Sequence, residues 1–266
     1  MKIFISADIE GTTGVVNWDE TEIDKEFSKY FCEQMTKEVN AACEGALSGG
    51  AEEVFIKDAH GPARNINPSN LPENVKIMRG WARNPLIMMA GLDETFQGVI
   101  FTGYHSAAGE NGNPLAHTLN GSIQHMHING EVASEFLINA YTAAYYNVPV
   151  LFLSGDKALC QSVKKVNKNI KTVAVSEGIG QGSISIHPNL AIKKIKEQVY
   201  EAVKDDLSKY IVELPKFFSV EVKFKDHFIA YKGGFYPGAT QVDAKTIKYE
   251  AEDYMDVLKF TFFAVN

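Results

Sequence analysis

An alternation of short apolar runs with longer segments of helical periodicity constrains the fold of this chain more than any other feature. Residues 2–7 form a strand-like apolar run, and apolar residues then recur at helical spacing over residues 27–46. The spacing of Thr21 and Asp24 resembles a capping box and predicts that the helix opens there, while Gly49 and Gly50 can end it. Residues 53–57 form the next predicted strand. The segment therefore predicts a βαβ unit with parallel strands and a right-handed crossover.

The same alternation continues along the chain. Further strands are predicted over residues 75–78, 98–102, 148–153 and 172–175, and helices over residues 85–90, 132–145 and 188–207. The run over residues 148–153 is apolar throughout, which is typical of a strand in a sheet that is covered on both faces. The sequence therefore predicts the α/β class, with a mostly parallel open sheet and helices on both faces.

The last fifth of the chain changes character. From Val220 to Lys225, apolar and charged residues alternate, which predicts a half-exposed strand of the antiparallel kind. A further strand over residues 246–249 and a helix over residues 252–263 follow. We expect a small C-terminal α+β part, with a soft boundary near Leu214–Pro215. This boundary divides the chain into an α/β metal-binding catalytic domain, residues 1–214, and a C-terminal strand–helix subdomain, residues 215–266.

Composition and charge narrow the function classes. The chain has 266 residues, is 45% hydrophobic and 22% charged, and so is neither disordered, collagenous nor a coiled coil. Its net charge of −7 disfavours a nucleic-acid partner. No apolar run approaches the roughly 20 residues of a membrane span, and Asp8 comes too early for a signal peptide. Three cysteines without a Cys-x-x-Cys pair argue against a disulfide framework. We expect a cytoplasmic protein with no membrane and no nucleic-acid partner.

Side chains that bind metals or transfer protons follow three of the predicted strands. Asp8 and Glu10 follow the first, Asp58 and His60 follow the second, and His105 follows the fourth. Because ligands bind at the carboxyl ends of strands in an open α/β sheet, we expect these groups to share one edge. Two neighbouring carboxylates repel unless a cation lies between them, and imidazoles with carboxylates suit zinc. Each residue alone also has a structural interpretation, as a cap, a solvated acid or a structural histidine. Asp58 either orients His60 or faces solvent.

The middle of the chain holds further candidates. His117 lies in a loop rich in glycine and asparagine, where catalytic residues are common. His125 and His127 share one side of a predicted strand, and their simplest interpretation is a polar strand face. Glu135 and Asn139 share one face of the predicted helix. Glu135 is either a buried carboxylate that needs a partner such as a metal, or an ordinary surface glutamate.

Together these residues resemble the M55 family of metallopeptidases, the D-aminopeptidases. The resemblance runs from residue 1 to about residue 180, and the ordered set of motifs is more specific than any one of them. The motifs are Ser6-Ala7-Asp8-Ile9-Glu10-Gly11, Asp58-Ala59-His60, Gly103-Tyr104-His105, His117-Thr118, and Glu135 with Asn139. One departure is Ser134, where the family's type enzyme has glycine, and this leaves the shape of the pocket open.

The resemblance implies a site with two Zn²⁺ per chain. Asp8 would bridge the two ions. Glu10 and His105 would complete the coordination of one ion, and His60 and Glu135 would complete the coordination of the other. His117 matches the catalytic histidine of the family, for which we favour a role as general acid or base over the alternative role of nucleophile. The family also implies a homodecamer of two stacked five-membered rings whose active sites face an inner chamber.

The predicted function is that of a binuclear zinc-dependent aminopeptidase. It would release N-terminal, D-configured amino acids from short peptides by means of a metal-activated water. One alternative is a two-metal hydrolase of another amide or ester bond. A phosphoesterase would want basic residues near the metals, and the segments around the expected ligands offer only Lys57. A second alternative is a binding protein without activity, which would be expected to lack one of the five ligands.

Overall fold

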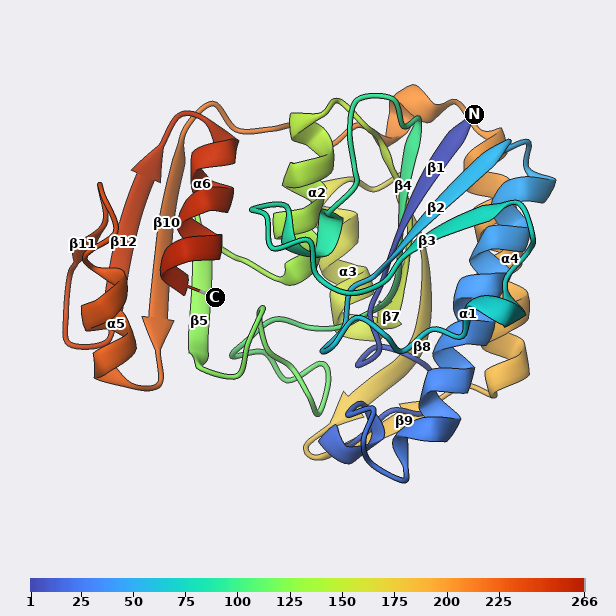
Figure 1. Cartoon of the computed structure of the whole chain (residues 1–266), viewed down its shortest axis with the longest axis horizontal. Coiled ribbons are helices and arrows are strands. Elements are labelled where there is room, and N and C mark those ends of the chain that lie inside the picture. Colours follow the sequence, from blue (N-terminus) through green and yellow to red (C-terminus); the bar gives the residue numbers. More distant parts are fainter. Residues whose placement is uncertain (266) are drawn as a thin grey trace.

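The computed structural model of the chain describes residues 1–265 and contains two sheets (Figure 1). The larger sheet has the strand order β3-β2-β1-β4-β7-β8-β9. Its strands are β1 (Lys2–Ala7), β2 (Glu53–Asp58), β3 (Val75–Met78), β4 (Gly98–Tyr104), β7 (Val150–Asp156), β8 (Lys171–Ile179) and β9 (Gly182–Ser185). Neighbouring strands run parallel except β8 and β9, which form an antiparallel hairpin. The predicted mostly parallel sheet is confirmed.

Helices cover both faces of this sheet. Helices α1 (Ser28–Ser48) and α4 (Pro188–Lys204) lie side by side against one face, and α2 (Glu135–Tyr145) and α3 (Lys157–Val166) lie against the other (Figure 1). Every residue of the central strands β4 and β7 is buried as a result. The α/β class with helices on both faces is therefore confirmed.

The first helix begins later than the sequence predicts. The Thr21 hydroxyl donates to the Trp18 carbonyl, 3.0 Å away, and so does not cap a helix. The capping box lies earlier, between Asn17 and Glu20 around the 3₁₀ turn η1 (Trp18–Glu20). The prediction that Thr21 and Asp24 open the helix is therefore wrong, and α1 starts at Ser28.

Other helix bounds differ by smaller amounts. Helix α2 starts at Glu135 because the Ser134 hydroxyl accepts from the amide of Leu137, 3.2 Å away. The residues just before it form β6 (Glu131–Val132). The helix predicted over residues 85–90 is a single 3₁₀ turn, η3 (Ile87–Met89). Two more 3₁₀ turns are η2 (Pro68–Asn70) and η4 (Leu207–Tyr210).

The second sheet is antiparallel and has the strand order β11-β12-β10-β5-β6. Its longer strands are β5 (Ile123–Ile128), β10 (Phe218–Phe224) and β12 (Thr246–Ala251), and β11 (Thr240–Gln241) lies at one edge. Helices α5 (His227–Gly233) and α6 (Tyr254–Phe260) pack on it, and the π-helical turn η5 (Thr261–Val265) follows. The predicted antiparallel character of residues 220–225 is confirmed.

Helix α2 joins the two cores. Phe136 and Ala140 pack into the core under the larger sheet, and Ile138 packs into the core under the second sheet. The buried Tyr254 hydroxyl donates to the Ile138 carbonyl at 2.7 Å. The boundary near Leu214–Pro215 stays a prediction, and β5 and β10, which pair directly, lie on opposite sides of it. No helix in the described residues has the length and apolar character to cross a membrane.

Candidate metal centre

Three adjacent parallel strands end at one edge of the larger sheet, and each supplies part of the site. Strand β1 lies between β2 and β4 and runs in the same direction as both. Asp8 follows β1, His60 follows β2 and His105 follows β4. The first turn of α2 reaches the same edge, so that Glu135 lies 3.4 Å from His105 (Oε2 to Nε2). The predicted convergence of strand ends is therefore observed.

Two glycines allow the ends of β1 and β4 to touch. The Gly11 amide donates to the Gly103 carbonyl at 2.8 Å, and the Asp8 amide donates to the Thr102 carbonyl at 2.9 Å. A Cβ atom at Gly11 would collide with the carbonyl of Tyr104, and one at Gly103 would collide with the carbonyl of Asp8. Gly103 also has a φ of +68°, which a side chain disfavours. These glycines bring the acidic side chains after β1 next to the histidine after β4.

The Asp8 carboxylate lies between two histidines. Its Oδ1 is 3.3 Å from His60 Nδ1, and its Oδ2 is 3.5 Å from His105 Nε2. Glu10 Oε2 lies 3.0 Å from His60 Nδ1, on the same side as Oδ1. Asp8, Glu10 and Glu135 are each at most 3% exposed. Glu135 is therefore a buried carboxylate and not a surface glutamate.

Each histidine of the site has one ring nitrogen bound to a backbone carbonyl. His60 Nε2 lies 3.1 Å from the Thr21 carbonyl, His105 Nδ1 lies 2.9 Å from the Ser106 carbonyl, and His117 Nδ1 lies 2.9 Å from the Leu115 carbonyl. A carbonyl only accepts, so in each ring this outer nitrogen carries the proton. The inner nitrogen of each neutral ring then presents a lone pair to the carboxylates. Histidines that bind metals in proteins are held in this way.

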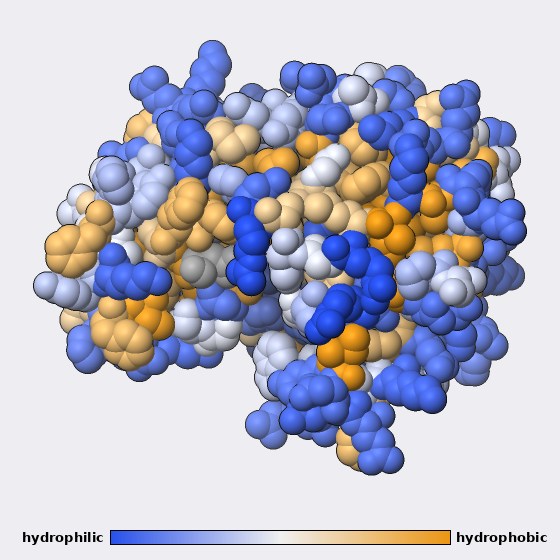
Figure 2. All heavy atoms as spheres, in the orientation of Figure 1, coloured by the Kyte–Doolittle hydropathy of each residue, from blue (hydrophilic) through white to orange (hydrophobic). Residues whose placement is uncertain are grey.

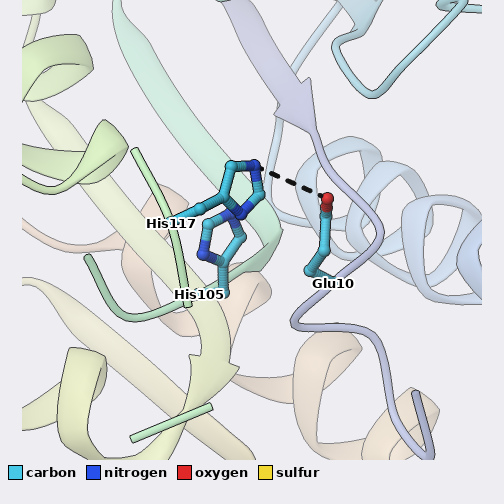
Figure 3. Close-up of side chains that lie close together, drawn as sticks. All are labelled: Glu10, His105 and His117. Carbon is cyan, nitrogen blue, oxygen red and sulfur yellow. Dashed lines mark ion pairs between the residues drawn. The ribbon is translucent and has the colours of Figure 1, made fainter. Parts of the chain in front are cut away.

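His117 completes the group from the loop between β4 and β5. Its Nε2 lies 3.8 Å from Glu10 Oε1 and 3.7 Å from Glu135 Oε1. The ring stacks on that of His105, with centroids 4.4 Å apart, and Figure 3 shows both rings beside Glu10. The Trp18 ring also packs against His117, in an edge-to-face arrangement with centroids 5.2 Å apart. The His117 side chain is 15% exposed and thus open to a ligand.

The buried charges strongly perturb one another. Burial by itself would raise the pKa of Glu10, but the nearby imidazoles, His60 above all, hold it well below its usual range. Burial would lower the pKa of His60 and His105, but their carboxylate neighbours raise both well above the usual value. Three buried acids therefore demand positive charge at this point. A divalent cation can supply that charge while the histidines stay neutral.

The donor atoms fall into groups of the size that a metal ion needs. Asp8, Glu10 and His60 offer atoms within 4.8 Å of one another, and so do Asp8, His105 and Glu135. Asp8 belongs to both groups. His105 Nε2 and Glu10 Oε2 are buried and make no hydrogen bond to any described residue. Buried nitrogen and oxygen atoms that lack a hydrogen-bond partner fit the role of metal ligands.

The division of donors differs from the one that the family resemblance implied. Glu10 groups with His60, and Glu135 groups with His105. Among the described residues, no three-donor group contains both His60 and Glu135. The cause is the sheet order, because His60 comes from the strand on one side of β1 and His105 comes from the strand on the other. Glu10 also lies near His105 and His117, in a third group.

Two further strand-end aspartates hold the loops that carry the histidines. Asp58 is fully buried and accepts from the amides of Asn65 and Ile66 at 2.6 and 2.9 Å. It does not face solvent, and it makes no hydrogen bond or ion pair with the ring of His60. Asp156, at the end of β7, accepts from the amide and hydroxyl of Ser106 at 2.6 and 2.7 Å. Sequence reasoning missed Asp156, although its position at a strand end was a usable signal.

The remaining candidates lie outside the donor groups. Asn139 donates to the Tyr104 hydroxyl at 2.9 Å, behind the site. His125 and His127 lie on β5 in the second sheet, where they form a separate group with Glu221 of β10. Lys223 pairs opposite His125, so positive charge flanks that group. The interpretation of this pair as a polar strand face agrees with their partial exposure.

A cavity of about 530 Å³ opens beside the donor groups. His117 and four of the metal-binding candidates form part of its wall, and the fifth candidate, His105, is buried behind them. The rest includes residues that sequence reasoning did not single out, namely Trp18, Trp81, Arg83, Asn84, Met88 and Phe262. Its volume lies within the range of sites for small molecules, roughly 300–1,000 Å³.

Comparison with known proteins gives three consistent findings. The model of the Peptidase M55 family, described as D-aminopeptidase, matches residues 1–263. A D-aminopeptidase of Bacillus subtilis (strain 168) is 28% identical over 260 residues, covering 96% of this chain and 93% of the relative. The structure described as the Zn-dependent D-aminopeptidase DppA from Bacillus subtilis, a self-compartmentalizing protease, superposes with a TM-score of 0.91 at 26% identity. That match covers 100% of this chain and 98% of the other.

Proposed function

The chain belongs to the M55 family of D-aminopeptidases, and on that premise we propose that it removes N-terminal D-amino acids from short peptides with two Zn²⁺ per chain. As an enzyme it is a zinc metallopeptidase, like the relatives that it matches. The observation that carries the proposal is the orientation of the three imidazoles. Each has its outer N–H on a backbone carbonyl and its inner lone pair toward a shared set of buried carboxylates.

The two donor groups would each hold one ion. Asp8, Glu10 and His60 would bind the first, and Asp8, His105 and Glu135 the second. The placement of Asp8 Oδ1 toward His60 and Oδ2 toward His105 supports a bridging role for this carboxylate. Bound zinc would polarise the scissile carbonyl and lower the pKa of a water. The five protein ligands exceed the four positions of one tetrahedral zinc, which supports a count of two.

His117 would transfer protons at Nε2. The Leu115 carbonyl holds its Nδ1–H, so Nε2 faces the site and is free to accept a proton. The imidazolium so formed would lie near Glu10 and Glu135, which stabilise positive charge. His117 can then return the proton to the leaving amine of the peptide. A role as general acid or base is favoured over one as nucleophile, because a zinc-bound water would already supply the nucleophile.

A metal-removal and substrate screen tests the proposal. The protein is stripped with a chelator, reloaded with zinc and assayed on D- and L-amino-acid amides and on a phosphomonoester. We expect no turnover in the stripped protein, recovery with zinc, and faster release from the D-amides. Hydrolysis of the phosphomonoester alone would support the alternative of another two-metal hydrolase. No turnover of any substrate with full metal loading would leave only a binding role.

Self-association is also proposed, up to a decamer. The similar DppA structure is described as self-compartmentalizing. On this chain, Phe228 and Phe235 on and after α5 are 62% and 72% exposed, and Figure 2 shows apolar side chains over this outer edge of the second sheet. Exposed apolar groups of this kind mark association surfaces. Light scattering should give about ten times the chain mass of 29.4 kDa, and a monomer would refute the proposal. A cytoplasmic location stays a prediction.

A further inference from the structure

Arg83 is the only lysine or arginine in the described wall of the cavity beside the metal centre. The three carboxylates of that wall all lie beside the histidines of the donor groups. The Arg83 side chain is exposed, and within residues 1–265 it makes no hydrogen bond or ion pair. An unpaired cation that borders a ligand-sized cavity is available to an anionic group of the ligand.

The loop that carries Arg83 is tied to the loop of His60. The buried amine of Lys57 donates to the Gly80 carbonyl at 2.9 Å and lies 4.3 Å from the ring centre of Trp81. Trp81 Nε1 donates to the Gly61 carbonyl, 2.7 Å away. Residues just before Arg83 are therefore anchored to residues on either side of His60. This anchoring fixes the origin of the Arg83 side chain relative to the metal donors.

The same loop adopts an unfavourable backbone conformation. Arg83 has a φ of +57° and Ile87 a φ of +47°, and both line the cavity. Positive φ is uncommon for side chains other than glycine and is an outlier for a β-branched residue such as isoleucine. Such strain persists only where the surroundings impose it, and it clusters at ligand sites. The backbone thus turns Arg83 into the cavity wall at an energetic cost.

We propose that Arg83 binds the C-terminal carboxylate of the substrate. The inference rests on the proposed aminopeptidase function, because an aminopeptidase substrate carries a free amine at one end and a carboxylate at the other. Only three of the 26 basic residues of the chain are arginines, and one of them borders the cavity. A guanidinium pairs with a carboxylate through two parallel hydrogen bonds, which an ammonium group does not.

The position of the cation sets the length of the peptide. An extended chain spans roughly 3.3–3.6 Å per residue, so the carboxylate of a dipeptide lies one residue beyond the scissile bond. In a peptide long enough for its carboxylate to pass beyond Arg83, this ion pair would be lost. The proposed substrates are therefore short peptides with a free carboxyl group, and peptides whose carboxylate lies beyond the reach of Arg83 should be poorer substrates.

The test compares D-alanyl-D-alanine with its C-terminal amide, which differs only in the carboxylate. In Arg83→Gln the ratio of kcat/KM for the dipeptide to that for the amide should fall on the order of 10- to 100-fold, mainly through KM. Arg83→Lys should give a smaller fall. Glutamine adds no backbone strain, because position 83 already carries a side chain. Arg64→Gln serves as the matched control, since Arg64 is exposed and does not line the cavity. It should leave the ratio unchanged.

Three outcomes are possible. A fall of the ratio in Arg83→Gln but not in Arg64→Gln supports the carboxylate site. Equal losses on both substrates, or no loss on either, overturn it while the proposed function stands, because the wild type still hydrolyses the amide. A zinc-loaded wild type that hydrolyses neither substrate overturns the proposed function itself. A series from two to six D-alanines provides a second measurement, and a flat dependence of kcat/KM on length would also overturn the inference.

Discussion

The two sheets of this molecule both carry histidines, but they place them differently. In the larger sheet, His60 and His105 follow the ends of parallel strands that flank β1. In the second sheet, His125 and His127 lie along β5, on the face of an antiparallel pair. The first two meet buried carboxylates at a single edge, and the second two remain partly exposed beside Lys223.

The difference follows from strand direction. Parallel neighbours end at the same edge, so the residues that follow them converge there even when they are far apart in the chain. Antiparallel neighbours place their ends at opposite edges, and what they bring together are residues directly across from each other. Across β5 and β10 these are a histidine with a lysine and a histidine with a glutamate. If the chemistry belongs to the strand ends, substitutions there should abolish it and substitutions in the second sheet should not.

The largest effect is expected at Asp8. In Asp8→Ala both ions should be lost, because this carboxylate belongs to both donor groups, and turnover should fall more than about 10³-fold. Glu10→Ala should lose about one ion. Zinc per chain and kcat are measured on the same preparations, with Asp8→Asn as a substitute should the alanine variant not fold.

The matched control for these variants is His127→Ala in the second sheet. It should keep the metal content and the turnover of the wild type. Equal metal losses in Asp8→Ala and Glu10→Ala would contradict the bridging role. Loss of metal in His127→Ala would mean that the second sheet contributes to the centre.

The next effect is expected at His117. His117→Ala should keep both ions and lose turnover by about 10²–10⁴-fold, because a positioned acid or base contributes that much. The loss should appear in kcat more than in KM, since proton transfer belongs to the transition state. If the ions leave together with the activity, His117 is a ligand of the third donor group. A loss below about tenfold would leave it with a packing role beside Trp18.

A smaller effect, on stability, is expected at Asp58. Asp58→Ala removes the acceptor of two buried backbone amides, and leaving each unsatisfied costs about 1–3 kcal/mol. The free energy of unfolding of the zinc-free protein should fall by about 2–4 kcal/mol in denaturant titrations. Asp226→Ala is the control, because Asp226 is exposed at the start of α5 and makes no capping hydrogen bond. Its cost should stay within about 0.5 kcal/mol.

The smallest effect concerns pH and the second sheet. Burial, with help from His127 and Lys223, lowers the pKa of His125 below its usual value of 6.5. The folded protein therefore binds this proton less readily than the unfolded chain, so stability falls as pH drops through the unfolded pKa. Between pH 7 and 5 the wild type should lose up to about 1 kcal/mol more than His125→Gln, since partial exposure screens the effect. A larger loss of stability in His125→Gln than in the wild type would contradict the predicted direction of the His125 pKa shift.

The sequence predicts the strand ends well and the partners of the strands poorly. Asp8, Glu10 and His105 could be placed at one edge because each follows an apolar run, and parallel strands end at the same edge of a sheet. The pairing of β5 with β10 joins residues about ninety positions apart, and periodicity does not identify such a partner. The grouping of the ligand atoms could not be predicted for the same reason, because it depends on the order of strands around β1.

The sequence also could not predict which backbone groups bind the histidines of the site. The Thr21, Ser106 and Leu115 carbonyls fix the ring nitrogens of the three histidines, and any residue type can provide a carbonyl. No sequence pattern pointed to Arg83 either. Its proposed role depends on a turn with positive φ, and an arginine in the sequence does not predict such a turn. The spacing of Thr21 and Asp24 predicts a helix start, whereas the Thr21 side chain closes a turn around Trp18.

The metal content of the purified protein tests the central claim most directly. The claim is that the ends of β1, β2 and β4, with the start of α2, form a single centre for two ions. Elemental analysis of undialysed protein should give about two divalent ions per chain, and zinc should restore activity after chelation. Less than half an ion per chain, with no activity regained on adding zinc, would contradict the account.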